Sequence, residues 1–166
     1  MRRWYLIAFV AMSFSVGCGA GGEYAQTDRS ASTNRGETNG RTLDFVSNRP
    51  EGDDWEVRVR GNSLWASYGD QDKIKALSTV RLDRKETDKV WRLIDAMELP
   101  ERKKGKKDED SGFVILVLRE PGGDDDKHDV FTVYISRDAD EEEELEKLAL
   151  YLQDLIKKYH KVEPEF

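Results

Sequence analysis

The chain has 166 residues, of which 37% are hydrophobic and 37% charged, and its formal net charge at pH 7 is −7. This length is typical of one domain, and the acidic balance argues against nucleic acid as a partner, because phosphate binding needs a basic stripe that releases counterions. A single cysteine excludes an internal disulfide, so the domain is stabilised by packing alone.

The first 17 residues have the three-part plan of a secretory signal peptide. Arg2 and Arg3 precede the apolar stretch Trp4 to Val16, and small residues follow it. As a helix this stretch is about 20 Å long, shorter than the roughly 30 Å hydrocarbon core of a bilayer. We therefore predict an exported protein with a signal peptide over residues 1–17 and not a permanent transmembrane helix.

Residues 15–18 read SVGC and resemble the lipobox of bacterial lipoproteins. The resemblance implies cleavage before Cys18 and acylation of its thiol, and more than one acyl chain gives stable attachment. Ser15 departs from the aliphatic residue usual at that position. Gly19 stands where an aspartate would favour the inner membrane, so the resemblance implies the outer membrane, on its periplasmic side or at the cell surface. The alternative is an ordinary signal peptide cut near Ala20, which discards Cys18.

Residues 19–40 are rich in glycine, serine, threonine, asparagine and charged residues, and Tyr24 is their only large apolar residue. Such a composition cannot form a core. A flexible coil of this length has an end-to-end distance of roughly 25 Å. We interpret residues 18–40 as the lipidated cysteine with its tether, and residues 41–166 as a single globular domain.

The spacing of apolar residues predicts five strands in this domain. Leu43 to Val46 is expected to be an edge strand. Trp55 to Arg60 alternates strictly between apolar and polar residues, and we expect it to form a β-hairpin with Ser63 to Tyr68. Phe113 to Leu118 is apolar on both faces and Val130 to Ile135 nearly so, a pattern that predicts the two central strands.

Two helices are also predicted. Asp83 and Glu86 have the spacing of a capping box at the start of the first helix, which Pro100 ends. Asp138 and Glu141 repeat the spacing before a second helix of about 20 residues. The second helix carries a continuous apolar stripe: Leu145, Leu148, Ala149, Leu152, Leu155, Ile156 and Tyr159.

The predicted order is three strands, a helix, two strands and a helix. This order indicates an α+β domain with a mainly antiparallel sheet of about five strands and both helices packed on one face. The second face of the central strands is then covered by the first strands, folded over it as a partial sandwich, or it meets a partner. Internal packing is favoured, since a monomer rarely exposes such a patch.

The sequence contains no pattern typical of an active site or a metal site. The acidic run Asp124 to Asp126, with His128 and Asp129, lacks the alternate ligands, central glycine and distal glutamate of an EF-hand, and we interpret it as a solvated hairpin tip. No HExxH, Walker A, GxGxxG or glycine-flanked nucleophile is present. We predict no catalytic residue, no metal and no small-molecule cofactor.

Two tryptophans are candidates for a binding surface. Trp55 and Trp65 lie on the two strands of the predicted hairpin, where they could stack on a carbohydrate. Alternation places Trp65 opposite Leu64 and Ala66, and the alternative is that Trp65 packs beneath a helix or loop. Trp91, beside the apolar stripe of the first helix, is expected to be core.

In the order of its elements, the stretch 55–160 resembles a loose group of small bacterial exported domains that includes the emfourin-like inhibitors of thermolysin-type metalloproteases. The resemblance implies no individual functional residue. The leading hypothesis is a tethered, non-catalytic binding or structural module of the cell envelope, held at the membrane by lipid and contacting an envelope or secreted protein. The alternatives are an inhibitor of a secreted metalloprotease and an enzyme that uses carboxylates brought together by folding.

Overall fold

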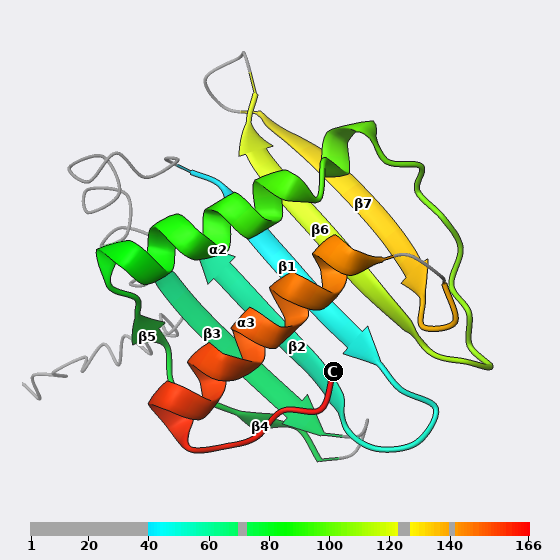
Figure 1. The fold of residues 1–166 in the computed structure, drawn as a ribbon, viewed down its shortest axis with the longest axis horizontal. Coiled ribbons are helices and arrows are strands. Elements are labelled where there is room, and N and C mark those ends of the chain that lie inside the picture. Colours follow the sequence, from blue (N-terminus) through cyan, green and yellow to red (C-terminus); the bar gives the residue numbers. More distant parts are fainter. Residues whose placement is uncertain (1–39, 70–72, 123–126, 140–141) are drawn as a thin grey trace, which may run out of the picture.

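The computed structural model describes residues 40–69, 73–122, 127–139 and 142–166. In it, two helices lie across one face of an antiparallel sheet (Figure 1). Among these residues no helix is long and apolar enough to cross a membrane. The predicted signal peptide, Cys18, almost all of the predicted tether and Asp124 to Asp126 lie outside the described residues.

The sheet has the strand order β4-β3-β2-β1-β6-β7, and β5 also pairs with β3. Its strands are β1 (Thr42–Asn48), β2 (Asp54–Arg60), β3 (Ser63–Gly69), β4 (Lys75–Ala76), β5 (Val80–Arg81), β6 (Phe113–Pro121) and β7 (His128–Ser136). The predicted α+β class, antiparallel sheet and two helices are confirmed. The sheet has more strands than the five expected, because β4 and β5 are two residues long and too short to show an apolar period.

The predicted positions of two strands are wrong. β1 was expected at the edge, but it lies in the middle of the sheet and pairs with β2 on one side and β6 on the other. Polar residues are typical of an exposed edge strand, but Thr42, Asp44 and Ser47 of β1 are all buried. β7 was expected to be central, but among the described residues it is an edge strand that pairs with β6 alone. The prediction for β6, between β1 and β7, is confirmed.

The predicted hairpin is confirmed as β2 and β3, which pair from Asp54 opposite Gly69 to Arg60 opposite Ser63. Gly61 in the connecting turn has φ +53°, the left-handed region that glycine adopts at least cost. The indole Nε1 of Trp91 donates a hydrogen bond of 2.8 Å to the Gly61 carbonyl. Trp91 is buried as expected, and this bond ties the first helix to the hairpin turn.

The first helix, α2 (Arg84–Ala96), begins with the predicted capping box. The Glu86 amide donates to the Asp83 carboxylate, the Asp83 amide donates to the Glu86 carboxylate, and both bonds are 2.9 Å long. The helix ends at Ala96, earlier than the predicted limit at Pro100. A short 3-10 turn, η1 (Leu99–Glu101), follows. Glu98, which lies between the two elements, has φ +48° in the left-handed region, so the α-helix cannot continue through it.

The second helix, α3 (Glu143–His160), has 18 residues, close to the expected length. Its predicted cap is wrong: Glu142 is the N-cap and has no side-chain capping bond, while Asp138 accepts a 2.6 Å hydrogen bond from the Ser111 hydroxyl. Acidic residues in the first turn and basic residues in the last complement the helix dipole at both ends. Charge at the termini therefore stabilises this helix instead of a side-chain cap.

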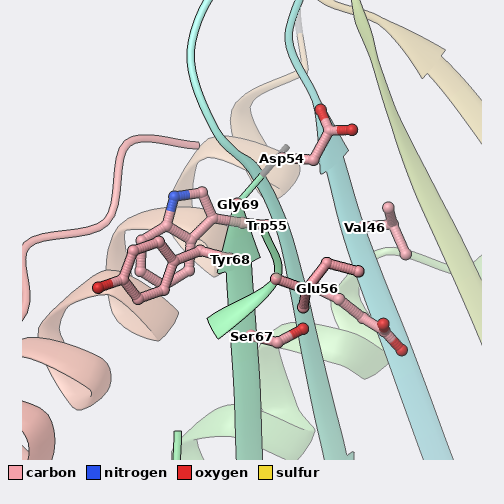
Figure 2. A pocket seen from close by; sticks show the side chains of 8 residues that line it. Val46, Asp54, Trp55, Glu56, Ser67, Tyr68 and Gly69 are labelled. Atoms are coloured by element: carbon pink, nitrogen blue, oxygen red, sulfur yellow. The ribbon is translucent and has the colours of Figure 1, made fainter. Parts of the chain in front are cut away.

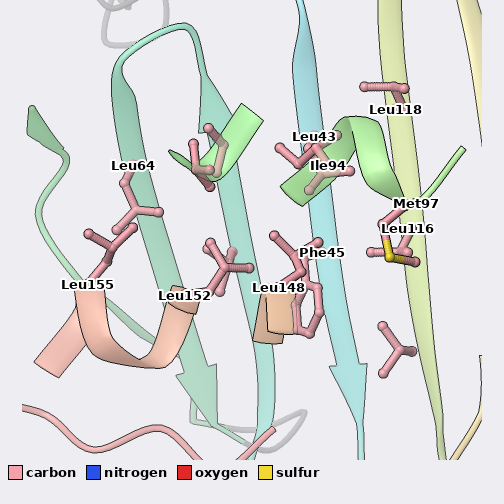
Figure 3. Packing of buried hydrophobic residues seen from close by; sticks show 14 of the residues in the cluster. Leu43, Phe45, Leu64, Ile94, Met97, Leu116, Leu118, Leu148, Leu152 and Leu155 are labelled. Carbon is pink, nitrogen blue, oxygen red and sulfur yellow. The ribbon is translucent and has the colours of Figure 1, made fainter. Parts of the chain in front are cut away.

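A single apolar core lies between the helices and the sheet (Figure 3). Leucines of α3 face the strands in Figure 3, where Leu152 and Leu155 approach Leu64 of β3. The chain terminus closes the core, since the ring of Phe166 lies 4.9 Å from Phe45. The fully buried positions on the strands are Leu43, Phe45, Val57, Val59, Leu64, Ala66 and Leu116.

Glu86 joins the two helices at one end of this core. Its carboxylate accepts hydrogen bonds from the Lys158 ammonium at 2.5 Å and the Tyr159 hydroxyl at 2.7 Å. Burial raises the pKa of Glu86, but the bonds from Lys158, Tyr159 and the Asp83 backbone outweigh burial, so the net pKa is lowered. The carboxylate is therefore held ionised, and it fixes the C-terminal end of α3 to the start of α2.

Candidate functional site

The sheet has one face without a helical cover among the described residues (Figure 1). We call this face the open face. The expected partial sandwich is wrong, because β1, β2 and β3 lie within the same sheet as β6 and β7 instead of folding over them. The strand registers assign the following central side chains to the open face: Asp44, Val46, Glu56, Arg58, Arg60, Trp65, Ile115, Val117, Arg119, Thr132 and Tyr134.

Asp44 lies at the centre of the open face between two arginines. Its carboxylate accepts a hydrogen bond of 2.6 Å from Arg58 Nε on β2, and a second from Arg119 Nη1 on β6. The Asp44 side chain is 9% exposed, whereas those of Arg58 and Arg119 are 44% and 40% exposed. The hydrogen bond to Asp44 raises the pKa of Arg58. A buried carboxylate thus orients two solvent-accessible guanidinium groups.

Trp65 lies beside this cluster on the open face. It is half-buried, and β2 places Arg58 directly opposite it. The Arg58 guanidinium carbon is 5.6 Å from the centre of the Trp65 ring, a cation–π contact worth about 0.5–1 kcal/mol at exposed sites. Neither helix covers Trp65, since both lie on the other face of the sheet. Trp65 is the residue of the predicted tryptophan pair that remains available for contact.

Trp55 points to the other face of the hairpin. It is buried, its ring stacks on Tyr68 at 4.5 Å, and its edge meets Phe166 at 5.8 Å. Figure 2 shows Trp55 and Tyr68 together, with Glu56 and Ser67 directed away from them. Trp55 and Trp65 therefore do not form the predicted shared surface. Trp55 pairs with Tyr68 and Trp65 pairs with Arg58, and these two pairs point to opposite faces of the sheet.

Apolar side chains cross the open face from β1 to β7. The strand registers place Val46 beside Ile115, and Ile115 beside Tyr134, while Val117 occupies the next row. All four are half-buried. We call these four residues the apolar band. The Lys104 ammonium lies 5.8 Å from the Tyr134 ring at one end of the band. Sequence reasoning missed the band because β1 was expected at the edge.

Cationic side chains lie along one border of the apolar band. Arg60 of β2 and Arg119 of β6 occupy the same cross-strand row on either side of Thr42. Arg81 of β5 extends that row beyond β3, where it lies opposite Ser63. Both Arg60 and Arg81 are exposed. This border is positive in a chain whose overall charge is −7.

No group of three or more histidine, cysteine, aspartate or glutamate side chains in the described part of the chain could hold a metal ion. His128 is exposed at the first residue of β7, and His160 is the last residue of α3. Burial lowers the pKa of His160. The two carboxylates central to the open face, Asp44 and Glu56, both bind Arg58. This arrangement is suited to recognition through arginine and apolar contacts.

A cavity of about 560 Å³ lies on the helix side of the sheet. Phe45, Val114 and Phe166 contribute its apolar walls, and Glu143 and Glu146 of α3 contribute acidic groups. A pocket of about 180 Å³ next to Trp55 and Tyr68 is smaller (Figure 2). Neither contains a tryptophan in contact with an arginine, the combination that Trp65 and Arg58 form on the open face.

No protein-family model matches the chain, and no curated protein matches its sequence. The resemblance to emfourin-like domains therefore rests on the order of the elements.

Replacing Asp44 by asparagine is expected to lower the free energy of unfolding by about 1–3 kcal/mol, because Arg58 and Arg119 lose their shared ionised acceptor. Urea denaturation at pH 7 measures the change. The matched control is Asp53→Asn, an exposed aspartate that should leave stability within about 0.5 kcal/mol of the parent. Equal stability of the two variants would show that Asp44 does not hold the open face together.

Proposed function

We propose that the chain is an exported, lipid-anchored protein of the bacterial cell envelope whose domain is a non-catalytic binding module. The open face is its contact surface. The observation that carries the proposal is the apolar band, Val46, Ile115, Val117 and Tyr134, on a face that no described helix covers. Arg58 and Asp44 lie between this band and Trp65 on the same face. Contiguous apolar surface rimmed by polar groups is typical of interaction sites.

The residue types of the open face favour a protein partner. Tryptophan, tyrosine and arginine are the residues enriched at interface hot spots, and Trp65, Tyr134 and Arg58 supply all three. Trp65 and Tyr134 bury large area at low cost in side-chain entropy, while Asp44 preorganises Arg58. The complementary partner is an envelope or secreted protein with an apolar contact area and carboxylates placed to meet Arg58, Arg60 and Arg119.

The anchor follows from the sequence of the first 40 residues. Signal peptide, SVGC and tether together place Cys18 at the membrane surface and allow the domain to range over roughly 25 Å. The predicted tether ends at Gly40, and β1, in the middle of the sheet, begins at Thr42. A tethered module of this kind meets partners near the membrane without a fixed orientation. Outer-membrane attachment agrees with Gly19 after the cysteine.

Intact mass tests the anchor. Protein extracted with detergent from its native host is expected to begin at Cys18 and to carry added acyl mass, because a lipobox directs both steps. The Cys18→Ala variant is the control and should carry no acyl group. An unmodified chain that begins after Ala20 would contradict lipidation and make the protein a freely soluble exported domain.

Affinity capture from a solubilised envelope extract tests the contact surface. The parent chain and Leu150→Lys, which alters an exposed apolar residue on α3, are expected to recover the same partner. Val117→Lys and Trp65→Ala are expected to lose at least tenfold of the captured partner, since each removes part of the open face. Circular dichroism checks that every variant is folded.

Two results of this capture would contradict the proposal. The first is reproducible failure of the parent chain to recover any partner. The second is capture that Val117→Lys and Trp65→Ala leave unchanged. Recovery of a secreted metalloprotease, with stoichiometric loss of its activity, would instead support the inhibitor alternative.

A further inference from the structure

The two strands beneath the centre of the apolar band are paired on both sides. β1 pairs with β2 and β6, and β6 pairs with β1 and β7. Their amides and carbonyls therefore bond within the sheet and are not available to a segment that lies on the face. An extended segment over the band would leave its own backbone groups without partners where water is excluded, which is costly. A helix satisfies its backbone groups internally and avoids this cost.

The apolar band is about as wide as one helix. Its residues lie on three neighbouring strands, β1, β6 and β7. Two strand spacings separate β1 from β7, roughly 10 Å, and a helix with its side chains is about 10–12 Å in diameter. On the other face of the same sheet, α2 and α3 pack over the strands in this way (Figure 1). One further helix on the open face would therefore cover the band.

Cationic side chains border the apolar band on two opposite sides. On the β2 side, Asp44 lies opposite Val117, and Arg58 lies opposite Asp44 in the same cross-strand row. On the β7 side, the Lys104 ammonium lies 5.8 Å from the centre of the Tyr134 ring. Both Arg58 and Lys104 are exposed. A helix placed along β6 would therefore have a cation beside each of its flanks.

Two more cations lie beyond the ends of the apolar band. Arg119 follows the band along β6, and the Lys107 ammonium lies 5.8 Å from the ring of Phe113, which precedes the band on the same strand. The carboxylates that adjoin the band in the strand registers are Asp44 and Glu56, and both bind Arg58. Cations therefore outnumber carboxylates around the band, in a chain whose overall charge is −7.

We propose that the open face binds an amphipathic helix of its partner, with an apolar stripe over the apolar band and carboxylates on both flanks of the stripe. The helix lies along β6, with one acidic flank facing Arg58 and the other facing Lys104. The inference rests on the proposed function, in which the open face is the contact surface. It adds that the partner sequence has apolar residues at i, i+3, i+4 and i+7, bordered on each side by aspartate or glutamate.

The arginines of the open face are oriented for this contact before the partner arrives. Asp44 binds Nε of Arg58 and Nη1 of Arg119, and Glu56 binds Nη2 of Arg58. A guanidinium has five N–H groups, so both arginines keep donors for a carboxylate of the partner. Because their orientation is already fixed, less side-chain entropy is lost on binding. Opposite charge on the helix would also speed its association.

Three synthetic peptides of about 18 residues, five helical turns, test the inference. The first has a leucine stripe, glutamates on both flanks, and alanine and glutamine on its outer face. The second has lysine in place of every glutamate, and the third has the composition of the first in scrambled order. With the full Cys18→Ala chain, amide NMR titration is expected to give the first peptide a dissociation constant at least about tenfold below those of the other two. The amides that shift should be those of β1 and β6.

Matched variants of the chain locate the contact. Lys104→Glu is expected to weaken binding of the first peptide by about three- to tenfold, because an attraction at one flank becomes a repulsion. Lys85→Glu, which makes the same charge change at an exposed position of α2, should leave binding within about twofold of the parent. Val117→Thr, a change of similar shape, should weaken binding because it replaces a methyl group of the band by a hydroxyl. Leu150→Thr on α3 should not.

Three results would overturn the inference. Equal affinity for the first two peptides would show that acidic flanks are not recognised, and equal affinity for the first and third would show that an amphipathic helix is not. Absence of binding by the first peptide would overturn both features together. Capture of an envelope partner that depends on the open face would, in each of these cases, leave the proposed function standing without the helix.

Discussion

The two-sided pairing of β1 is the constraint on which the rest of the structure depends. β1 joins the β2–β3 hairpin to the β6–β7 hairpin, and no other strand in the described ranges pairs with both hairpins. A one-residue slip on either side would turn Leu43 and Phe45 away from the helices. Asp44 opposes such a slip, because it binds Arg58 from one neighbour and Arg119 from the other. The same ion pairs therefore fix the register and shape the open face.

The two faces of the sheet differ because of this register. On one face, the apolar residues of five strands meet α2 and α3; Glu86 links the two helices, and Phe166 packs on Phe45. On the other face, the half-buried apolar band lies beside a buried carboxylate and its arginines. One layer of helices stabilises the domain and leaves the second face without a helical cover among the described residues. The binding role that we propose rests on this asymmetry.

Local patterns in the sequence predicted the local structure well. The Asp83 and Glu86 spacing identified a real capping box, and strict alternation from Trp55 to Arg60 identified a real hairpin strand. These predictions succeed because each depends on residues that are close in sequence. The α+β class also followed, since the lengths and order of the apolar stretches leave few ways to form one core.

Long-range placement could not be predicted from the same patterns. Asp44 reads as a surface residue until Arg58 and Arg119 are brought to it from positions 14 and 75 residues away. β7 reads as a central strand because its apolar character does not indicate which strands lie next to it in the sheet. The opposite orientation of Trp55 and Trp65 could have been predicted from the sequence. Aligning the two strands across the hairpin turn and following their alternation puts the two side chains on opposite faces of the sheet.

Amide hydrogen exchange tests the central role of β1 most directly. Both sides of β1 are paired, so the amides from Leu43 to Ser47 should be among the most protected in the domain and should open only with global unfolding. The amides of β4 and β5 should exchange much earlier. Exchange of β1 ahead of β2 and β6 would contradict the account, because the sheet would then consist of two hairpins that do not depend on their shared strand.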